Sequence, residues 1–160
     1  MDDIDRLDIK GFVTNAITDV FATMFSMKVK MDNSDSPGAG QGDQIVGSVS
    51  FAGDVVGNVS IYVPKGFAIK ITAAMLDIEV DEVKSDEEVR DAIGELCNMV
   101  GGDLKSRLCD FGFPCILSIP TITIGSDFKI ESKGWIRNER FGFKYREHTA
   151  LVEVYLKSNK

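Results

Sequence analysis

The amino-acid sequence predicts an α+β domain in which amphipathic helices pack on a mainly antiparallel sheet. Two observations predict this class: apolar side chains recur at helical spacing in three segments, and links of hairpin length join the strand-like segments. The chain has 160 residues and 44% of them are hydrophobic, which is enough for one core. We therefore expect residues 1–160 to form a single domain.

The first half of the chain predicts two helices around a hairpin. A helix is predicted over residues 11–27, where the apolar positions at helical spacing are Val13, Ile17, Val20 and Met24. Residues 32–44 have the composition of a loop. Two alternating or β-branched runs, 45–51 and 57–63, predict an antiparallel hairpin because only the five residues AGDVV separate them. Residues 65–77 return to helical spacing and predict a second helix.

The second half predicts one long helix followed by strands. Ser85 precedes a segment with apolar residues at helical spacing, and Glu88 lies three positions after Ser85. This is the pattern of a helix capping box. A third helix is therefore predicted over residues 86–108. Beyond it, four segments have strand composition: residues 114–125, 128–132, 135–147 and 149–156.

Charge and composition exclude several classes of protein. The formal net charge of -7 argues against general nucleic-acid binding, which needs clustered Lys and Arg. No apolar run approaches the length of a membrane span, and the first residues are acidic where a secretion signal would be basic. The three cysteines are odd in number and lack metal-ligand spacing. We expect reduced thiols, with Cys97 and Cys109 packed in the interior, in a cytoplasmic protein.

The third helix carries the candidate site. On a helix with about 100° per residue, four positions fall within about 40° of Asp91 and form a stripe with it: Glu95, Asn98, Gly102 and Lys105. The opposite face is apolar and is expected to pack on the sheet. It consists of Val89, Ile93, Leu96, Val100 and Leu104.

Two adjacent glycines interrupt this helix although each costs about 1 kcal/mol relative to alanine. Gly102 lies one turn beyond Asn98 on the polar stripe, so its missing side chain leaves room for another molecule to approach. Spacing alone also fits a stripe that only solvates the helix, since exposed acidic and amide side chains usually have no further role.

The segment DAIGELCNMVGGDLKSRL resembles the signature of the CheC/CheX/FliY chemotaxis phosphatase family. In that signature Asp or Ser precedes a Glu by four positions and Asn follows the Glu by three, and Asp91, Glu95 and Asn98 match it. The family pattern also expects a proline 22 positions beyond the Asn, where this chain has Pro120. The resemblance extends over most of the chain and is least diagnostic after residue 126.

This resemblance implies a function. Asn98 would hold a water in line with the phosphorus of a phospho-aspartate on a CheY-type response regulator, and Glu95 would engage a lysine of that regulator. Asp91, Gly102 and Lys105 would contact the same partner. The resemblance places Mg2+ in the regulator's own acidic pocket, so no cofactor is expected in this chain. Positioning one water suits phosphoryl transfer, because this reaction depends on in-line geometry and charge stabilisation.

The first helix resembles a degenerate copy of the third. A shift of 76 positions superposes Val13 on Val89 and Asp19 on Glu95, but it places Ala22 at the position of Asn98. Chance similarity between two amphipathic helices remains an alternative. An internal pseudo-twofold duplication with one surviving site is typical of CheX-like members of the family. Those members are typically homodimers, so a homodimer is expected here by resemblance.

Two other functions remain open at this point. The chain could be a non-catalytic binding module for a receiver domain or a flagellar-switch component, in chemotaxis or another two-component pathway. A small-ligand sensor is a third reading, which would require a closed apolar pocket.

Overall fold

The computed structural model describes residues 4–32, 42–126, 134 and 137–160. Its α-helices are α1 (Ile9–Phe25), α2 (Lys65–Leu76) and α3 (Asp86–Asp110), and its short 3-10 helices are Ile4–Arg6 and Val80–Glu82. The strands are β1 (Lys30–Asp32), β2 (Asp43–Gly53), β3 (Val55–Pro64), β4 (Cys115–Leu117), β5 (Thr121–Ser126), β6 (Arg137–Tyr145) and β7 (His148–Ser158). The α+β class with a mainly antiparallel sheet is confirmed.

The described strands form one sheet in the order β1-β6-β7-β3-β2-β4, with β5 also paired to β2. Each of these pairings is antiparallel. The predicted hairpin is confirmed, because Phe51 pairs with Gly57 at the last paired position and leaves five residues between them. The segment 149–156 is internal, since β7 lies between β6 and β3, whereas β4 and β5 lie along one edge.

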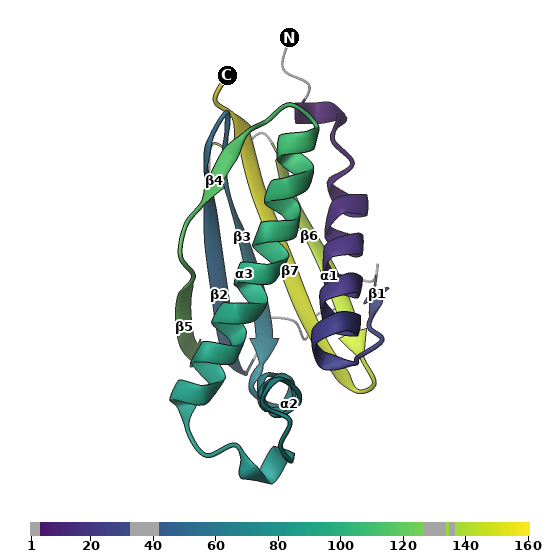
Figure 1. Cartoon of the computed structure of the whole chain (residues 1–160), viewed down its shortest axis with the longest axis vertical. Coiled ribbons are helices and arrows are strands. Elements are labelled where there is room, and N and C mark those ends of the chain that lie inside the picture. The colour runs from purple at the N-terminus through teal and green to yellow at the C-terminus, as the bar shows by residue number, and fades with distance from the viewer. Residues whose placement is uncertain (1–3, 33–41, 127–133, 135–136) are drawn as a thin grey trace.

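Helices α1 and α3 lie side by side across one face of the sheet, and α2 lies at the end where α3 begins (Figure 1). Alternate side chains of the two central strands point into this layer because successive strand residues face opposite sides. Val59 and Ile61 of β3 and Val152 and Val154 of β7 are among the buried core residues there. The predicted apolar face of α3 is buried against them.

The other face of the sheet holds buried polar side chains. Glu153 of β7 is only 3% exposed, and its carboxylate accepts a hydrogen bond of 2.8 Å from the Tyr155 hydroxyl. The Arg140 guanidinium lies 3.4 Å from the same carboxylate but is itself largely exposed. Burial, followed by the hydrogen bond to Glu153, raises the pKa of Tyr62. The two tyrosine hydroxyls provide hydrogen-bond partners for the buried Glu153 carboxyl group, which would otherwise destabilise the fold.

The segment 114–125 differs from the continuous strand that its composition suggests. It divides into β4 and β5, which pair with successive parts of β2. Pro120 lies in the break, and a proline has no N–H to donate to a neighbouring strand. Ser118 bridges the break, because its N–H donates to the Ser50 carbonyl and its Oγ accepts from the Ser50 N–H, both at 2.9 Å.

Other boundaries follow the predictions within a few residues. α1 begins two residues before the predicted helix, and α3 extends two residues beyond it. The strand β1 was not predicted, because three residues are too few to show a pattern. The strand-like segment 128–132 lies outside the described residues.

Candidate functional site

The start of α3 is fixed by the predicted capping box. The Ser85 Oγ accepts a hydrogen bond of 3.2 Å from the Glu88 N–H. The Glu88 carboxylate in turn accepts from the Ser85 N–H at 3.1 Å and from the Lys84 N–H at 2.9 Å. These bonds satisfy N–H groups that have no partner within the helix, so the register of the polar stripe is set from its N-terminal end.

Two glycines let α3 lie directly on β2. A Cβ placed on Gly47 of β2 would overlap the Cys97 Sγ of α3. A Cβ on Gly101 of α3 would lie 2.6 Å from the Val49 Cγ2 of β2. Each element thus supplies one glycine where the other presents a side chain. The close contact holds the inner face of α3 on the sheet and turns the stripe outward.

The structure brings the predicted site residues together on the outer face of α3. Asp91, Glu95 and Asn98 are exposed, and Lys105 is half-buried. Among the described residues, none makes a side-chain hydrogen bond or ion pair with the Glu95 carboxylate or the Asn98 amide. Both groups are available to another molecule, and the helical rise places them about 4.5 Å apart along the axis.

The two adjacent glycines of α3 have different surroundings. Gly101 is buried and contacts the sheet, whereas a Cβ on Gly102 would meet nothing within 4 Å. Packing therefore explains Gly101, and nothing within the described chain explains why residue 102 is glycine. The open space beside Gly102 agrees with the expectation of clearance along the stripe.

Pro120 lies beside the stripe. A Cβ on Gly94 of α3 would be 4.0 Å from the Pro120 Cβ and 3.8 Å from the Ile122 Cδ1. The break between β4 and β5 thus borders the helix next to Glu95. Sequence spacing gave the position of this proline in the chain, but only the pairing of β5 with β2 places it against α3.

The thiols of the chain take no part in this face. Cys97 is buried, and desolvation raises its pKa to about 12. Cys115 is also buried, and desolvation together with the neighbouring Cys109 thiol raises its pKa to about 11. A thiolate is therefore disfavoured at both positions at neutral pH. Interior packing, the expectation for Cys97, is confirmed, while Cys109 is only partly buried.

Two features are absent from the part of the chain that the structure describes. No group of three or more His, Cys, Asp and Glu side chains is arranged to hold a metal ion. No described helix combines the length and the apolar character needed to cross a membrane.

Under the shift of 76 positions, corresponding residues of α1 and α3 have similar burial, but the exposed faces of the two helices differ. Val13 and Val89 are both buried, and Asp19 and Glu95 are both exposed. Under the same shift Ser26 corresponds to Gly102, but Ser26 ends α1 in a left-handed conformation with φ of 53°. The stripe on α1 is therefore shorter, and it has alanine in place of the amide at the position that corresponds to Asn98. The internal duplication itself stays a prediction.

The outer face of α3 presents groups with complementary abilities. A carboxylate attracts a cation, whereas an amide can accept a hydrogen bond from a water and donate one to an anionic oxygen. Both groups lie on a convex helix surface, so a partner has to bring the reacting group to them. The fold and the site define a class of α+β domain that acts on or binds another macromolecule.

Comparison with known proteins identifies the family. The family model described as "Chemotaxis phosphatase CheX" matches residues 45–143, which is more than half of the chain. The chain belongs to the CheX family. The resemblance to the wider CheC/CheX/FliY group is confirmed.

Individual relatives agree with this assignment. The "CheY-P phosphatase CheX" of Thermotoga maritima is 32% identical over 93 residues, which are 58% of this chain and 59% of that protein. A crystal structure of the chemotaxis protein CheX from Vibrio vulnificus has a TM-score of 0.81 at 25% identity and covers 95% of this chain and 98% of its own. The CheX chain similar to this one in a CheX–CheY–BeF3–Mg2+ complex of Borrelia burgdorferi has a TM-score of 0.76 at 19% identity, covering 96% and 100%.

Proposed function

We propose that this chain is a phosphatase that accelerates hydrolysis of the phospho-aspartate of a CheY-like response regulator. The observation that carries the proposal is the pair Glu95 and Asn98, exposed and without partners among the described residues, on the helix of a CheX family member. The relative from Thermotoga maritima is named as a CheY-P phosphatase. The substrate class comes from that relative, and the candidate groups come from this chain.

Asn98 is the residue proposed to position the attacking water. Its amide oxygen accepts from the water while its NH2 group donates to a phosphoryl oxygen, which holds the water in line with the phosphorus. A carboxylate at this position would repel the anionic phosphoryl group. A barrier lowered by about 1.4 kcal/mol corresponds to a tenfold higher rate, so one positioned water is sufficient to accelerate hydrolysis by one or two orders of magnitude.

Glu95 is proposed to bind a lysine of the regulator. Asn98 lies three residues further along the same helix face, so an ion pair at Glu95 fixes the helix where Asn98 can enter the partner's active site. Asp91 and Lys105 extend the contact in both directions along the stripe, and Gly102 provides clearance. Mg2+ would be held by the regulator, as the composition of the Borrelia burgdorferi complex suggests.

The proposal includes two further expectations from the family. A homodimer is expected, and a cytoplasmic location follows from the class of substrate. Size-exclusion chromatography with light scattering measures the first, and an elution mass of one chain would contradict it.

The decisive experiment compares the decay of a phosphorylated response regulator in the presence of different forms of the full chain. The wild type should accelerate phosphate loss, and Asn98→Ala should leave only the regulator's own rate. Glu95→Ala should raise KM more than it lowers kcat, because it removes binding and keeps the water-positioning amide. Asn15→Ala is the matched control, since Asn15 is an exposed asparagine on the corresponding face of α1.

The same experiment separates the enzyme from the non-catalytic binding module. A binding module would bind the regulator carrying a beryllofluoride phosphoryl analogue, yet phosphate loss would be equal with wild type and Asn98→Ala. That result would contradict the proposed phosphatase. Acceleration by the wild type that Asn98→Ala abolishes while binding persists would support it.

A further inference from the structure

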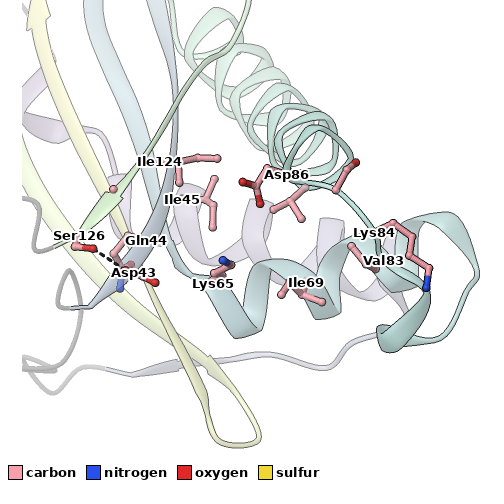
Figure 2. A pocket seen from close by; sticks show the side chains of 13 residues that line it. Asp43, Gln44, Ile45, Lys65, Ile69, Val83, Lys84, Asp86, Ile124 and Ser126 are labelled. Atoms are coloured by element: carbon pink, nitrogen blue, oxygen red, sulfur yellow. Dashed lines mark hydrogen bonds between the residues drawn. The ribbon is translucent and has the colours of Figure 1, made fainter.

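A second candidate site lies at the N-terminal end of α3, away from the polar stripe. A cavity of about 340 Å³ opens between the first residues of α2 and α3 and the paired ends of β2 and β5 (Figure 2). Its volume falls within the range of ligand-binding pockets, about 300–1,000 Å³. Asp86 at this end and Asn98 are twelve residues apart on α3, or about 18 Å along the axis. Asp91, the stripe residue nearest to Asp86, is about 7.5 Å from it along the axis, and no residue of the stripe lines the cavity.

One wall of the cavity is apolar and comes from all four elements. Ile45 of β2 and Val89 of α3 belong to the core, and Ile69 of α2 packs against that core. Ile124 of β5 is 39% exposed although it is a large apolar side chain. Figure 2 shows Ile45 and Ile124 next to each other on this wall. A ligand with an apolar part would remove this surface from water, which is favourable.

The rim carries charges of both signs. Lys65, the first residue of α2, and Asp86, the first residue of α3, both line the cavity. No ion pair joins them, and within the described part of the chain neither side chain has a salt bridge. In Figure 2 the Asp86 carboxylate points toward Ile45, and Lys65 lies below the same space. Two opposite charges border one cavity without contacting each other.

We propose that this cavity binds a small zwitterion with an apolar side chain, of the chemical class of the apolar α-amino acids. The ligand carboxylate binds the Lys65 ammonium, and the ligand ammonium binds the Asp86 carboxylate. The apolar side chain lies on the wall formed by Ile45, Val89 and Ile124. A zwitterion provides a partner for both Lys65 and Asp86, whereas a simple anion or cation leaves one of them without a partner.

The charged rim distinguishes this cavity from the closed apolar pocket of a sensor domain. Asp43 adds a further carboxylate, but its Oδ1 already accepts a hydrogen bond of 2.6 Å from the Ser126 hydroxyl. Lys84 also lines the cavity, yet its side chain extends away from the other labelled residues in Figure 2. Lys65 and Lys84 are thus two exposed lysines at the same cavity with different orientations, which makes Lys84 a matched control.

The test is a calorimetric titration of the full chain with L-phenylalanine and L-leucine, supported by thermal unfolding with the same ligands. Saturable binding and a Tm that rises with ligand concentration are expected, because the ligand binds only the folded state. Two analogues each lack one charge: 3-phenylpropionate has no ammonium, and phenethylamine has no carboxylate. Each should bind about tenfold more weakly than phenylalanine, which corresponds to one lost charge-assisted hydrogen bond.

Charge-removing variants assign the contacts. Lys65→Met should weaken the binding of phenylalanine about tenfold and leave the affinity for phenethylamine unchanged. Asp86→Asn should weaken the binding of phenylalanine and leave the affinity for 3-phenylpropionate unchanged. Lys84→Met should bind phenylalanine like the wild type. The proposal is overturned if neither amino acid binds, if the one-charge analogues bind as tightly, or if Lys65→Met behaves like Lys84→Met. None of these measurements uses a response regulator, so the outcome is independent of the proposed phosphatase activity.

Discussion

Replacement of Gly102 by alanine should stabilise the protein although glycine is the residue that stands there. Glycine in a helix interior costs about 0.8–1.0 kcal/mol relative to alanine, largely because the unfolded chain gains conformational freedom. A Cβ at Gly102 meets nothing within 4 Å, so no steric cost offsets this gain. We expect the free energy of unfolding to rise by about 1 kcal/mol, which corresponds to about 2–4 °C in Tm for a domain of this length.

The neighbouring Gly101 provides a matched control with the opposite sign. The same helix-propensity gain applies, but the new Cβ would lie 2.6 Å from the Val49 Cγ2 and 3.2 Å from the Leu117 Cδ1. Valine is branched at Cβ and cannot move its methyl group cheaply. Overpacking of this kind costs about 1–3 kcal/mol. Gly101→Ala should therefore lower the free energy of unfolding by up to about 2 kcal/mol.

Urea unfolding followed by circular dichroism measures both variants against the wild type. Equal or lower stability of Gly102→Ala would refute the inference that the space beside residue 102 is empty in the isolated chain. If that space serves a partner, Gly102→Leu should keep the gain in stability and raise KM for the phosphorylated regulator. A variant that is more stable and less active would show that glycine stands at this position for the encounter with the partner.

Four further predictions concern single side chains. Ser85→Ala should lower the free energy of unfolding by about 1 kcal/mol, measured by urea unfolding, because it removes the cap of α3. Cys97 should resist alkylation in the folded chain at pH 8, as read by mass spectrometry, because burial raises its pKa to about 12 and the reactive thiolate is populated only as the pH approaches that value. Tyr155→Phe should destabilise by about 2 kcal/mol, because it removes a hydrogen bond to the buried Glu153 carboxylate. Arg140→Ala should lower the free energy of unfolding by under about 1 kcal/mol, because Arg140 is exposed. Equal losses of stability in Tyr155→Phe and Arg140→Ala would contradict these roles.

Local sequence patterns were sufficient to predict the helices and the stripe. The capping box from Ser85 to Glu88 and the apolar period of α3 act over three or four residues, so they are visible in the chain itself. The same period placed Glu95 and Asn98 on one exposed face. The reaction was not visible in the spacing; it came from the wider signature that includes Pro120.

Contacts between distant residues were not predictable in this way. The break between β4 and β5 is bridged by Ser118 and Ser50, which are 68 positions apart. The close packing of α3 on β2 depends on Gly47 lying against Cys97, and no local sequence pattern around either residue predicts this contact. The cavity at the start of α3 requires four elements to meet. Each of these features is a property of the assembled sheet and helices.

The comparison of α1 with α3 shows why one chain should carry only one site. Packing on the sheet constrains the inner positions of both helices, whereas no packing within the chain constrains the exposed positions, so these can diverge. Ala22 stands where α3 has Asn98, and it is exposed. Asparagine at this position should therefore lower the free energy of unfolding by less than about 1 kcal/mol, mainly through its lower helix propensity.

An added amide should nevertheless not create a second site. Helix α1 ends at Phe25, three residues beyond Ala22, whereas α3 continues for twelve residues beyond Asn98. The surface that corresponds to Gly102 and Lys105 is thus missing from α1. In an Asn98→Ala background, Asp19→Glu with Ala22→Asn should leave the decay of the phosphorylated regulator at its own rate. Restored acceleration in that variant would mean that the carboxylate and the amide suffice, and that the rest of the stripe on α3 has no part in binding the partner.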